Sequence, residues 1–179
     1  MPFIAIALMV AAALGGGVSV AANNSLPGDA LWGFKTSVNE SIRGAFTAGD
    51  EAKANWDIAV VSARLDEAQK LAVEGKLDAD VQAKIMANFD AHAQDIAERI
   101  SKLQVSGKAD VAADVAARFQ AQLAQHASAI TEASTAQEAH VQATMVPFLA
   151  SVRGTLDAAA NLSASASNHT SATGTINVL

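Results

Sequence analysis

Two histidines, His92 and His126, are the residues whose type and position could bind a metal ion in this sequence. Each lies in a helical stripe of apolar residues, and neutral imidazole is the commonest metal ligand in proteins. If the chain reverses at Ser106-Gly107, His126 lies opposite about position 87, and His92 is roughly 7.5 Å further along the helix axis. Zinc binds histidine nitrogen at about 2.0–2.1 Å. We therefore predict that both histidines close the core stripes without a metal, and joint metal binding remains the alternative.

Other groupings that support catalysis are missing from the sequence. The chain has no Cys, which excludes a thiol nucleophile and Cys-ligated metals. Its triple glycine, residues 15–17, lies in an apolar segment and not in a phosphate-binding loop. No histidine has a Glu three residues before it, as the Glu-x-x-His pairs of di-iron bundles require. We predict a protein that is not an enzyme and uses no cofactor.

The first 22 residues carry no charged side chain. Phe3 to Leu14 is an apolar run with the length of a signal-peptide core, and "VSVAA" offers small residues for cleavage after Ala21 or Ala22. Residues 3–22 together are also long enough to span a bilayer. We predict that residues 1–22 are a signal peptide or a membrane anchor. The rest of the chain would then be extracytoplasmic, whether secreted, at the cell surface or membrane-anchored.

The remaining sequence is typical of an Ala-rich helical protein, since charged residues make up 17% and aromatic residues only 4%. Apolar residues recur at helical spacing over residues 34–46, 54–72, 81–103 and 111–130. A fifth helix should follow, kinked or restarted by Pro147 and fading near Leu162. Short connections predict antiparallel neighbours, so the fold class is all-α, an antiparallel helical bundle or extended helical hairpins. We predict a helical domain over 23–160 and a disordered polar tail over 161–179.

Polar residues and glycines mark the expected helix ends. Asp50 and Asp78 are predicted N-caps, and Gly75 is a predicted C-terminal stop. Ser37 and Glu40 have the spacing of a capping box at the start of the first helix. Two ion pairs at i, i+4 spacing are expected on the outer face of the third helix: Asp95–Arg99 and Glu98–Lys102.

A tight turn is predicted immediately after the apolar segment, within "LPGDALWGFK". Pro27 and Gly28 suit the central positions of a type II turn, because glycine accepts the positive φ that the second position requires. Asp29 should cap the backbone that follows, and Trp32 should pack on the second helix. We predict a structural motif that needs no ligand, formed by Leu26, Pro27, Gly28, Asp29, Leu31, Trp32 and Lys35.

These residues resemble a known family. "LPGDALWGFK" followed by "ARLDEAQKLAVEGKL" is similar to the bacterial exported family catalogued as domain of unknown function fifty-six sixty-seven. The similarity is best over residues 25–105, with Trp32 in place of the usual Tyr and Gly33 where Pro is common. The second motif comprises Arg64, Leu65, Glu67, Ala68, Leu71 and Gly75. The resemblance implies a domain that follows a signal or membrane segment, and it implies no activity.

The charge pattern bears on the partners of the protein. The net charge is −6 and no Lys/Arg cluster is present, so we expect no nucleic-acid binding. We predict a non-enzymatic, exported or membrane-tethered helical domain of the cell envelope, with a structural or protein-interaction role. Its partner would be an envelope protein or a second copy, with membrane contact through residues 3–22 if these are not cleaved. The alternatives are a metal- or small-ligand-binding bundle using His92 and His126, and a holdase-like chaperone with an apolar concave face.

Overall fold

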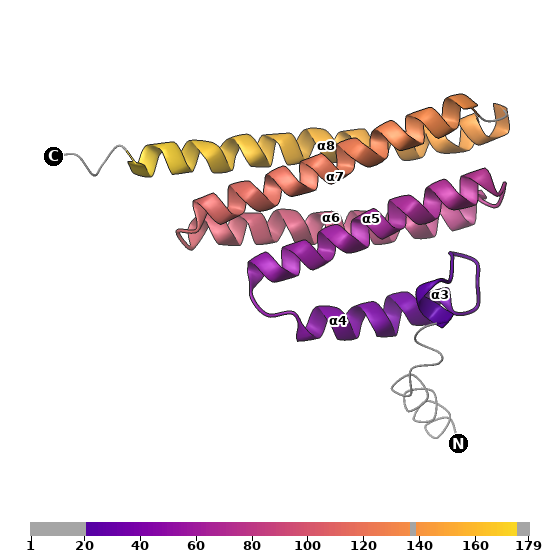
Figure 1. The fold of residues 1–179 in the computed structure, drawn as a ribbon, viewed down its shortest axis with the longest axis horizontal. Helices are drawn as coiled ribbons and strands as arrows, with labels where there is room; N and C mark the ends of the chain where they lie inside the picture. The colour runs from indigo at the N-terminus through magenta and orange to yellow at the C-terminus, as the bar shows by residue number, and fades with distance from the viewer. Residues whose placement is uncertain (1–20, 137–138, 175–179) are drawn as a thin grey trace, which may run out of the picture. The chain divides into compact units, whose positions relative to one another are not determined.

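The computed structural model describes residues 21–136 and 139–174 (Figure 1). The chain divides into two compact units, one ending at Phe46 and the other beginning at Thr47. The described residues form helices and turns and contain no strand, which confirms the all-α fold class. Residues 1–20 of the predicted signal peptide or anchor lie outside the described residues. Among those described, no helix combines the length and the apolarity needed to cross a membrane.

The first unit contains a helical run in three parts. These are α3 (Trp32–Phe34), the π-helical segment η1 (Lys35–Asn39) and α4 (Glu40–Phe46). Ser37 lies inside η1, so the helix begins before it and the predicted capping box at Ser37 and Glu40 is wrong. Helical hydrogen bonding starts at the turn instead, where the Lys35 N–H reaches the Leu31 carbonyl at 2.9 Å.

The apolar stripe predicted for this run is only half right. Phe34 and Val38 are half-buried, whereas Ile42 is 43% exposed and Phe46 is 86% exposed. A π-turn closes its hydrogen bonds at i→i+5 and so holds one residue more than an α-turn. Residues after η1 are therefore rotated away from the i, i+4 stripe on which the prediction rested.

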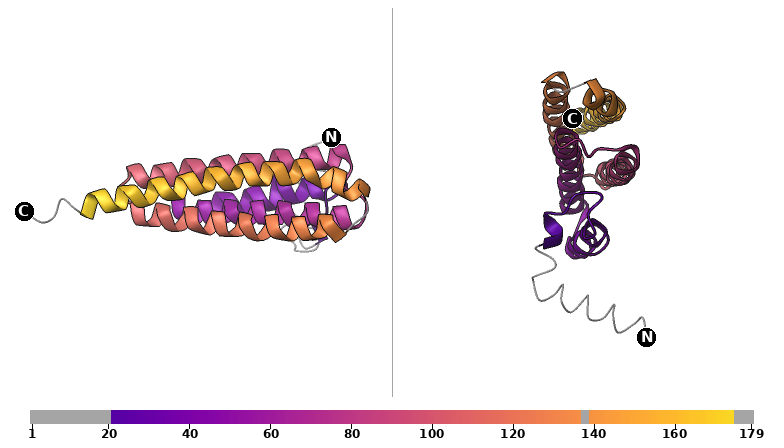
Figure 2. Two further views of the ribbon diagram at one scale, coloured as in Figure 1. Left: turned by 90° about the horizontal axis from the view of Figure 1, so that it is seen from above. Right: turned by 90° about the vertical axis from the view of Figure 1, so that its right-hand side faces the viewer.

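The second unit is an antiparallel arrangement of four long helices. Its helices are α5 (Asp50–Val73), α6 (Ala79–Val105), α7 (Ala109–Ala136) and α8 (Ala139–Gly174). Figures 1 and 2 show α5 and α6 side by side as one hairpin, and α7 and α8 as another. The hairpins join because α7 packs on α5 and α6, while α8 packs chiefly on α7 and also on α6. The predicted antiparallel bundle of helical hairpins is confirmed for these residues.

Apolar periodicity identified most of the core correctly. Every residue of the predicted α5 stripe is buried, as are the apolar members of the α6 stripe and most of the α7 stripe. The α5 stripe comprises Ala54, Ile58, Val61, Leu65, Ala68 and Ala72. Phe89 of α6 and Phe148 of α8 meet inside the bundle with ring centroids 6.4 Å apart and planes inclined at 52°. The largest apolar side chains that are fully buried in the described residues include Phe89, Phe119, Phe148, Leu65, Ile85, Ile96, Ile100, Leu103, Leu123 and Ile130.

The expected helix ends are confirmed at two of three positions. Asp78 caps α6, since its Oδ1 accepts a hydrogen bond of 2.8 Å from the Val81 N–H. Gly75 ends α5 with a φ of 67°, a conformation that favours glycine. Asp50 is the first residue of α5 and not its cap, because the residue in the cap position is Gly49, whose φ is 84°. Its carboxylate still lies at the positive end of the helix dipole.

The last helix is longer than the sequence pattern predicts. Pro147 lies inside α8 and does not restart it, although proline cannot donate the helical hydrogen bond. Met145, Phe148 and Val152 are buried around it, and this packing offsets the missing bond. The helix continues past Leu162 to Gly174, through most of the segment expected to be a disordered tail. That segment is rich in Ala and has neither Gly nor Pro between residues 155 and 173 to end the helix.

Candidate functional site

The predicted turn at residues 26–29 is present. The Asp29 N–H donates to the Leu26 carbonyl at 2.9 Å, and Gly28 has the positive φ of 101° that the turn requires. The Asp29 carboxylate accepts a 2.7 Å hydrogen bond from the Leu26 N–H, so it caps the backbone that precedes it. The prediction that this side chain caps the following backbone is wrong. The main-chain N–H of Trp32 instead donates to the main-chain carbonyl of Asp29 at 3.1 Å.

The rest of the motif supports this turn locally. Pro27 is buried, and the Lys35 ammonium reaches the Ser25 carbonyl at 3.4 Å. Leu31 and Trp32 are half-buried. Trp32 is therefore not the fully enclosed anchor that the sequence suggested, and truncating it should cost less than the ~3–5 kcal/mol of a fully buried aromatic residue.

Replacing Gly28 with Val should destabilise the turn by about 1–3 kcal/mol, because a β-branched side chain strains a backbone at positive φ. Thermal denaturation of residues 23–179 would measure the effect. Gly33→Ala is the matched control, since a Cβ at Gly33 meets no atom within 4 Å. This control should melt at or above the parent temperature, because Ala favours a helix more than Gly does. If Gly28→Val has the same melting temperature as the parent, the turn does not contribute to stability as predicted.

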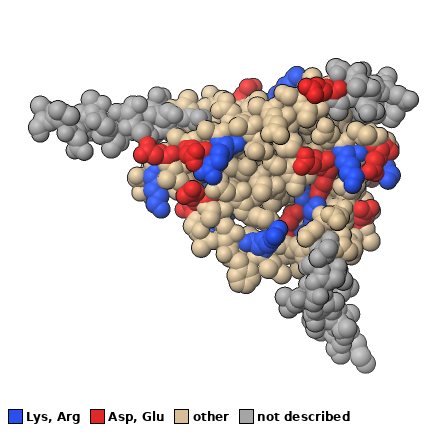
Figure 3. All heavy atoms as spheres, in the orientation of Figure 1, with Lys and Arg blue, Asp and Glu red and all other residues tan. Residues whose placement is uncertain are grey.

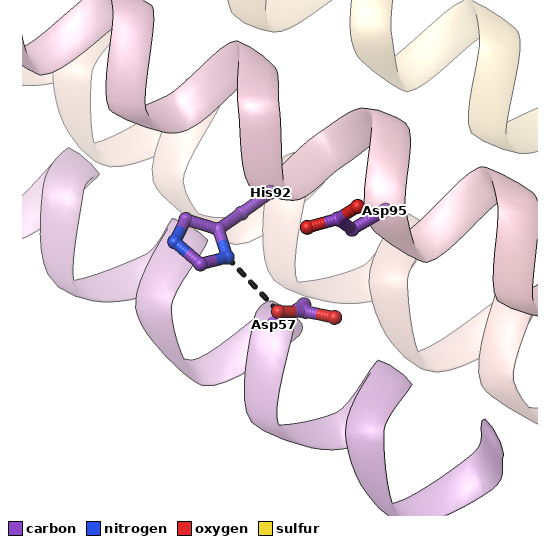
Figure 4. A group of neighbouring side chains, drawn as sticks. All are labelled: Asp57, His92 and Asp95. Carbon is purple, nitrogen blue, oxygen red and sulfur yellow. Dashed lines mark hydrogen bonds and ion pairs between the residues drawn. The ribbon is translucent and has the colours of Figure 1, made fainter. Parts of the chain in front are cut away.

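A polar cluster lies between α5 and α6, centred on Asp57 (Figure 4). Asp57 is only 4% exposed, and each of its carboxylate oxygens has a partner on α6. Oδ1 lies 2.9 Å from Nδ1 of His92, and Oδ2 accepts a 2.9 Å hydrogen bond from Nε of Arg99. A buried carboxylate is stable only when it is paired in this way. Asp57 therefore ties the two helices together.

The spacing along α6 explains how one carboxylate reaches both partners. His92 and Arg99 are seven residues apart, which is two helical turns, so both side chains lie on one face. Asp95 is three residues after His92 on the same face. Ligand atoms of Asp57, His92 and Asp95 all lie within 4.8 Å of one another.

Arg99 does not form the predicted ion pair with Asp95. Its guanidinium pairs with Asp57, and its Nη1 lies 3.8 Å from the Asp50 carboxylate. The two carboxylates of α5 thus satisfy the guanidinium across the helix interface. Within the described part of the chain, the side chain of Asp95 has neither a hydrogen bond nor an ion pair. The other predicted pair, Glu98–Lys102, is confirmed at 2.6 Å, and the hydrogen bond from Lys102 lowers the pKa of Glu98.

The structure does not bring His92 and His126 together. His126 of α7 is buried, and its Nδ1 lies 3.6 Å from the Asp66 carboxylate of α5. Each histidine thus faces a different aspartate of α5. Asp57 and Asp66 are nine residues apart, roughly 13 Å along the helix. One ion could not bind both histidines at that separation.

The sequence analysis did not predict a functional role for three charged residues that are buried on α5: Asp57, Arg64 and Glu67. Arg64 is fully buried, and its Nη2 lies 3.3 Å from Oε1 of Glu67. A signal for them existed, because positions 57 and 64 are two turns apart and border the apolar stripe that contains Ile58 and Leu65. Arg64 and Glu67 also belong to the second motif of the family resemblance.

Comparison with known proteins identifies the family but no activity. No curated protein and no solved structure matches the chain. One family model, described as Domain of unknown function (DUF5667), matches residues 24–147. The match begins before the turn and extends through α5, α6 and α7, so it includes both the turn and the polar cluster. The chain therefore belongs to the DUF5667 family of unknown function.

Proposed function

We propose that the protein is an exported or membrane-tethered domain of the bacterial cell envelope that works without catalysis, as a structural or protein-interaction module. The observation that supports this most is that buried polar side chains of the bundle pair with each other across helix interfaces. Asp57 bridges to His92 and Arg99, and His126 faces Asp66, so these side chains connect α5 to its neighbours. Groups with these partners stabilise helix packing.

The distribution of apolar side chains favours this role over that of a holdase. A holdase would present a broad apolar face to unfolded chains. In the described residues the large exposed apolar side chains lie on four different helices, whereas α5, α6, α7 and α8 enclose an apolar core. These exposed side chains are Ile42, Phe46, Val73, Val105 and Val146.

The charged surface favours a protein partner over nucleic acid. Figure 3 shows basic side chains interspersed with acidic ones on the visible face. Arg118, for example, pairs with Asp114 on its own helix and lies 3.6 Å from Glu51 of α5. With a net charge of −6, the chain should not attract phosphate backbones. We propose an envelope protein or a second copy as partner, with membrane contact through residues 3–22 if these are retained.

Export is tested by fusing residues 1–34 to a reporter enzyme that is active only outside the cytoplasm. We expect activity, because the apolar run and the small residues before position 23 are typical of an export signal. An intact fusion that stays inactive in the cytosol would contradict the proposal. The mass of the native chain would then distinguish a cleaved signal from a retained anchor.

A further inference from the structure

We propose that Asp57, His92 and Asp95 bind a single divalent first-row transition-metal ion, for which Zn²⁺ is the reference probe. The site differs from the His92–His126 pair considered from sequence, and it does not depend on where the protein is located. Its ligand atoms come from two helices and lie within 4.8 Å of one another (Figure 4).

The distances require only small side-chain movements. Zinc bonds to nitrogen and carboxylate oxygen are about 2.0–2.2 Å long, so tetrahedral ligand atoms are roughly 3.3–3.6 Å apart. The 2.9 Å between His92 Nδ1 and Asp57 Oδ1 is slightly shorter than this. Binding would replace that hydrogen bond, with the metal on Nδ1 and the imidazole proton on Nε2. Neutral His92 then releases no proton, whereas protonated His92 releases one to solvent.

The charges of the cluster suit a divalent cation. Asp50 and Asp57 pair with Arg99, and the ligand atoms of Asp95 lie near those of Asp57 and His92. Three carboxylates with one guanidinium leave two net negative charges when His92 is neutral. Asp57 and Asp95 repel each other at this separation. Asp95 has no other partner in the described part of the chain, although Figure 4 shows its carboxylate on the side facing Asp57 and His92. A bound divalent ion removes this repulsion.

Arg99 orients one ligand in advance. It holds Oδ2 of Asp57 at 2.9 Å and leaves Oδ1 directed at His92, as hydrogen-bonded partners orient metal-ligating carboxylates. His92 and Asp95 have the i, i+3 spacing by which one helix supplies two ligands to one ion. One imidazole and two carboxylates, without sulfur, suit Zn²⁺ or another borderline ion and do not suit Cu⁺. His92 is half-buried, so water can occupy a fourth position.

Isothermal titration calorimetry with Zn²⁺, on the full-length tag-free chain in mild detergent, tests the site. We expect one ion per chain, and at least about tenfold weaker binding by His92→Ala and Asp95→Asn. His126→Ala is the matched control, because His126 is also buried beside an aspartate. Its affinity should equal that of the parent. The proposal would be overturned if the parent does not bind Zn²⁺ one-to-one, or if both site variants keep the parent affinity. It would also be overturned if only His126→Ala loses Zn²⁺ binding.

Asp95→Asn keeps the test independent of folding. The Asp95 side chain has no hydrogen bond or ion pair to lose in the described structure, and its replacement removes the repulsion of Asp57. Without metal this variant should therefore melt at or slightly above the parent temperature. Zn²⁺ should raise the melting temperature of the parent, because an ion bound only by the folded state stabilises it. The same addition should leave Asp95→Asn unchanged. An equal rise in both proteins would place the zinc elsewhere and contradict the site.

Discussion

Phe89→Ala should lower the free energy of unfolding by about 3–5 kcal/mol, as measured by urea denaturation of residues 23–179. Phe89 is fully buried on α6, where its ring meets that of Phe148 on α8 at 6.4 Å. Truncation removes a large apolar side chain and leaves a cavity between helices from different hairpins. It also removes a tilted ring pair at a favourable separation.

Phe46→Ala provides the control for Phe89→Ala, because it is the same substitution at a residue that is 86% exposed. It should change stability by no more than about 0.5 kcal/mol, since surface substitutions usually have small effects. Similar losses of stability in Phe89→Ala and Phe46→Ala would contradict the burial of Phe89 in the core.

Arg64→Met should destabilise the protein by about 3–5 kcal/mol, because it removes one member of a buried charge pair. Arg64 is 0% exposed, and the Glu67 carboxylate 3.3 Å from it is nearly as buried. The methionine can fill much of the space, but it cannot compensate the carboxylate charge. The loss would again be measured as a change in the urea midpoint at constant slope.

The double variant Arg64→Met/Glu67→Gln separates charge from packing. Neutralising the carboxylate should recover part of the stability lost in Arg64→Met, since the uncompensated charge is then absent. If the double variant is less stable than Arg64→Met by the full cost of a second mutation, the two side chains are not energetically coupled.

The helices of the second unit were predictable because apolar side chains recur with the helical period. The stripe from Ala54 to Ala72 is buried as predicted, and so are Phe89 and Phe119 at the centres of the next two stripes. Gly75 and Asp78 mark a helix end and a helix start through local backbone chemistry. Signals of this kind lie within a few residues of sequence, which is why they could be recognised directly.

The first unit shows where periodicity fails. The π-helical turn at Lys35–Asn39 is a change in hydrogen-bond pattern that apolar spacing does not reveal, and it displaces Ile42 and Phe46 from the expected stripe. In the second unit, the N-cap of α5 was also misassigned to Asp50, because Gly49 occupies the cap position with a positive φ of 84°. Gly49 occupies the N-cap position in a conformation that favours glycine, and no side chain caps the helix there.

The polar cluster was missed for a different reason. Sequence spacing identified the face of α6 that carries His92, but it could not show which helix lies opposite that face. The turn at Ser106-Gly107 indicated only that His92 of α6 and His126 of α7 are at different levels, whereas both residues face aspartates of α5. Contacts between helices depend on the three-dimensional arrangement of all of them, and apolar patterns in single helices do not determine it.

The proposal that this domain works outside the cytoplasm is tested most directly by labelling one introduced cysteine in intact cells. The chain has no cysteine of its own, so Ala83→Cys, at an exposed position of α6, supplies its only thiol. We predict that a membrane-impermeant maleimide labels this residue in intact cells as fully as it does after lysis. Labelling that appears only after lysis would contradict the account.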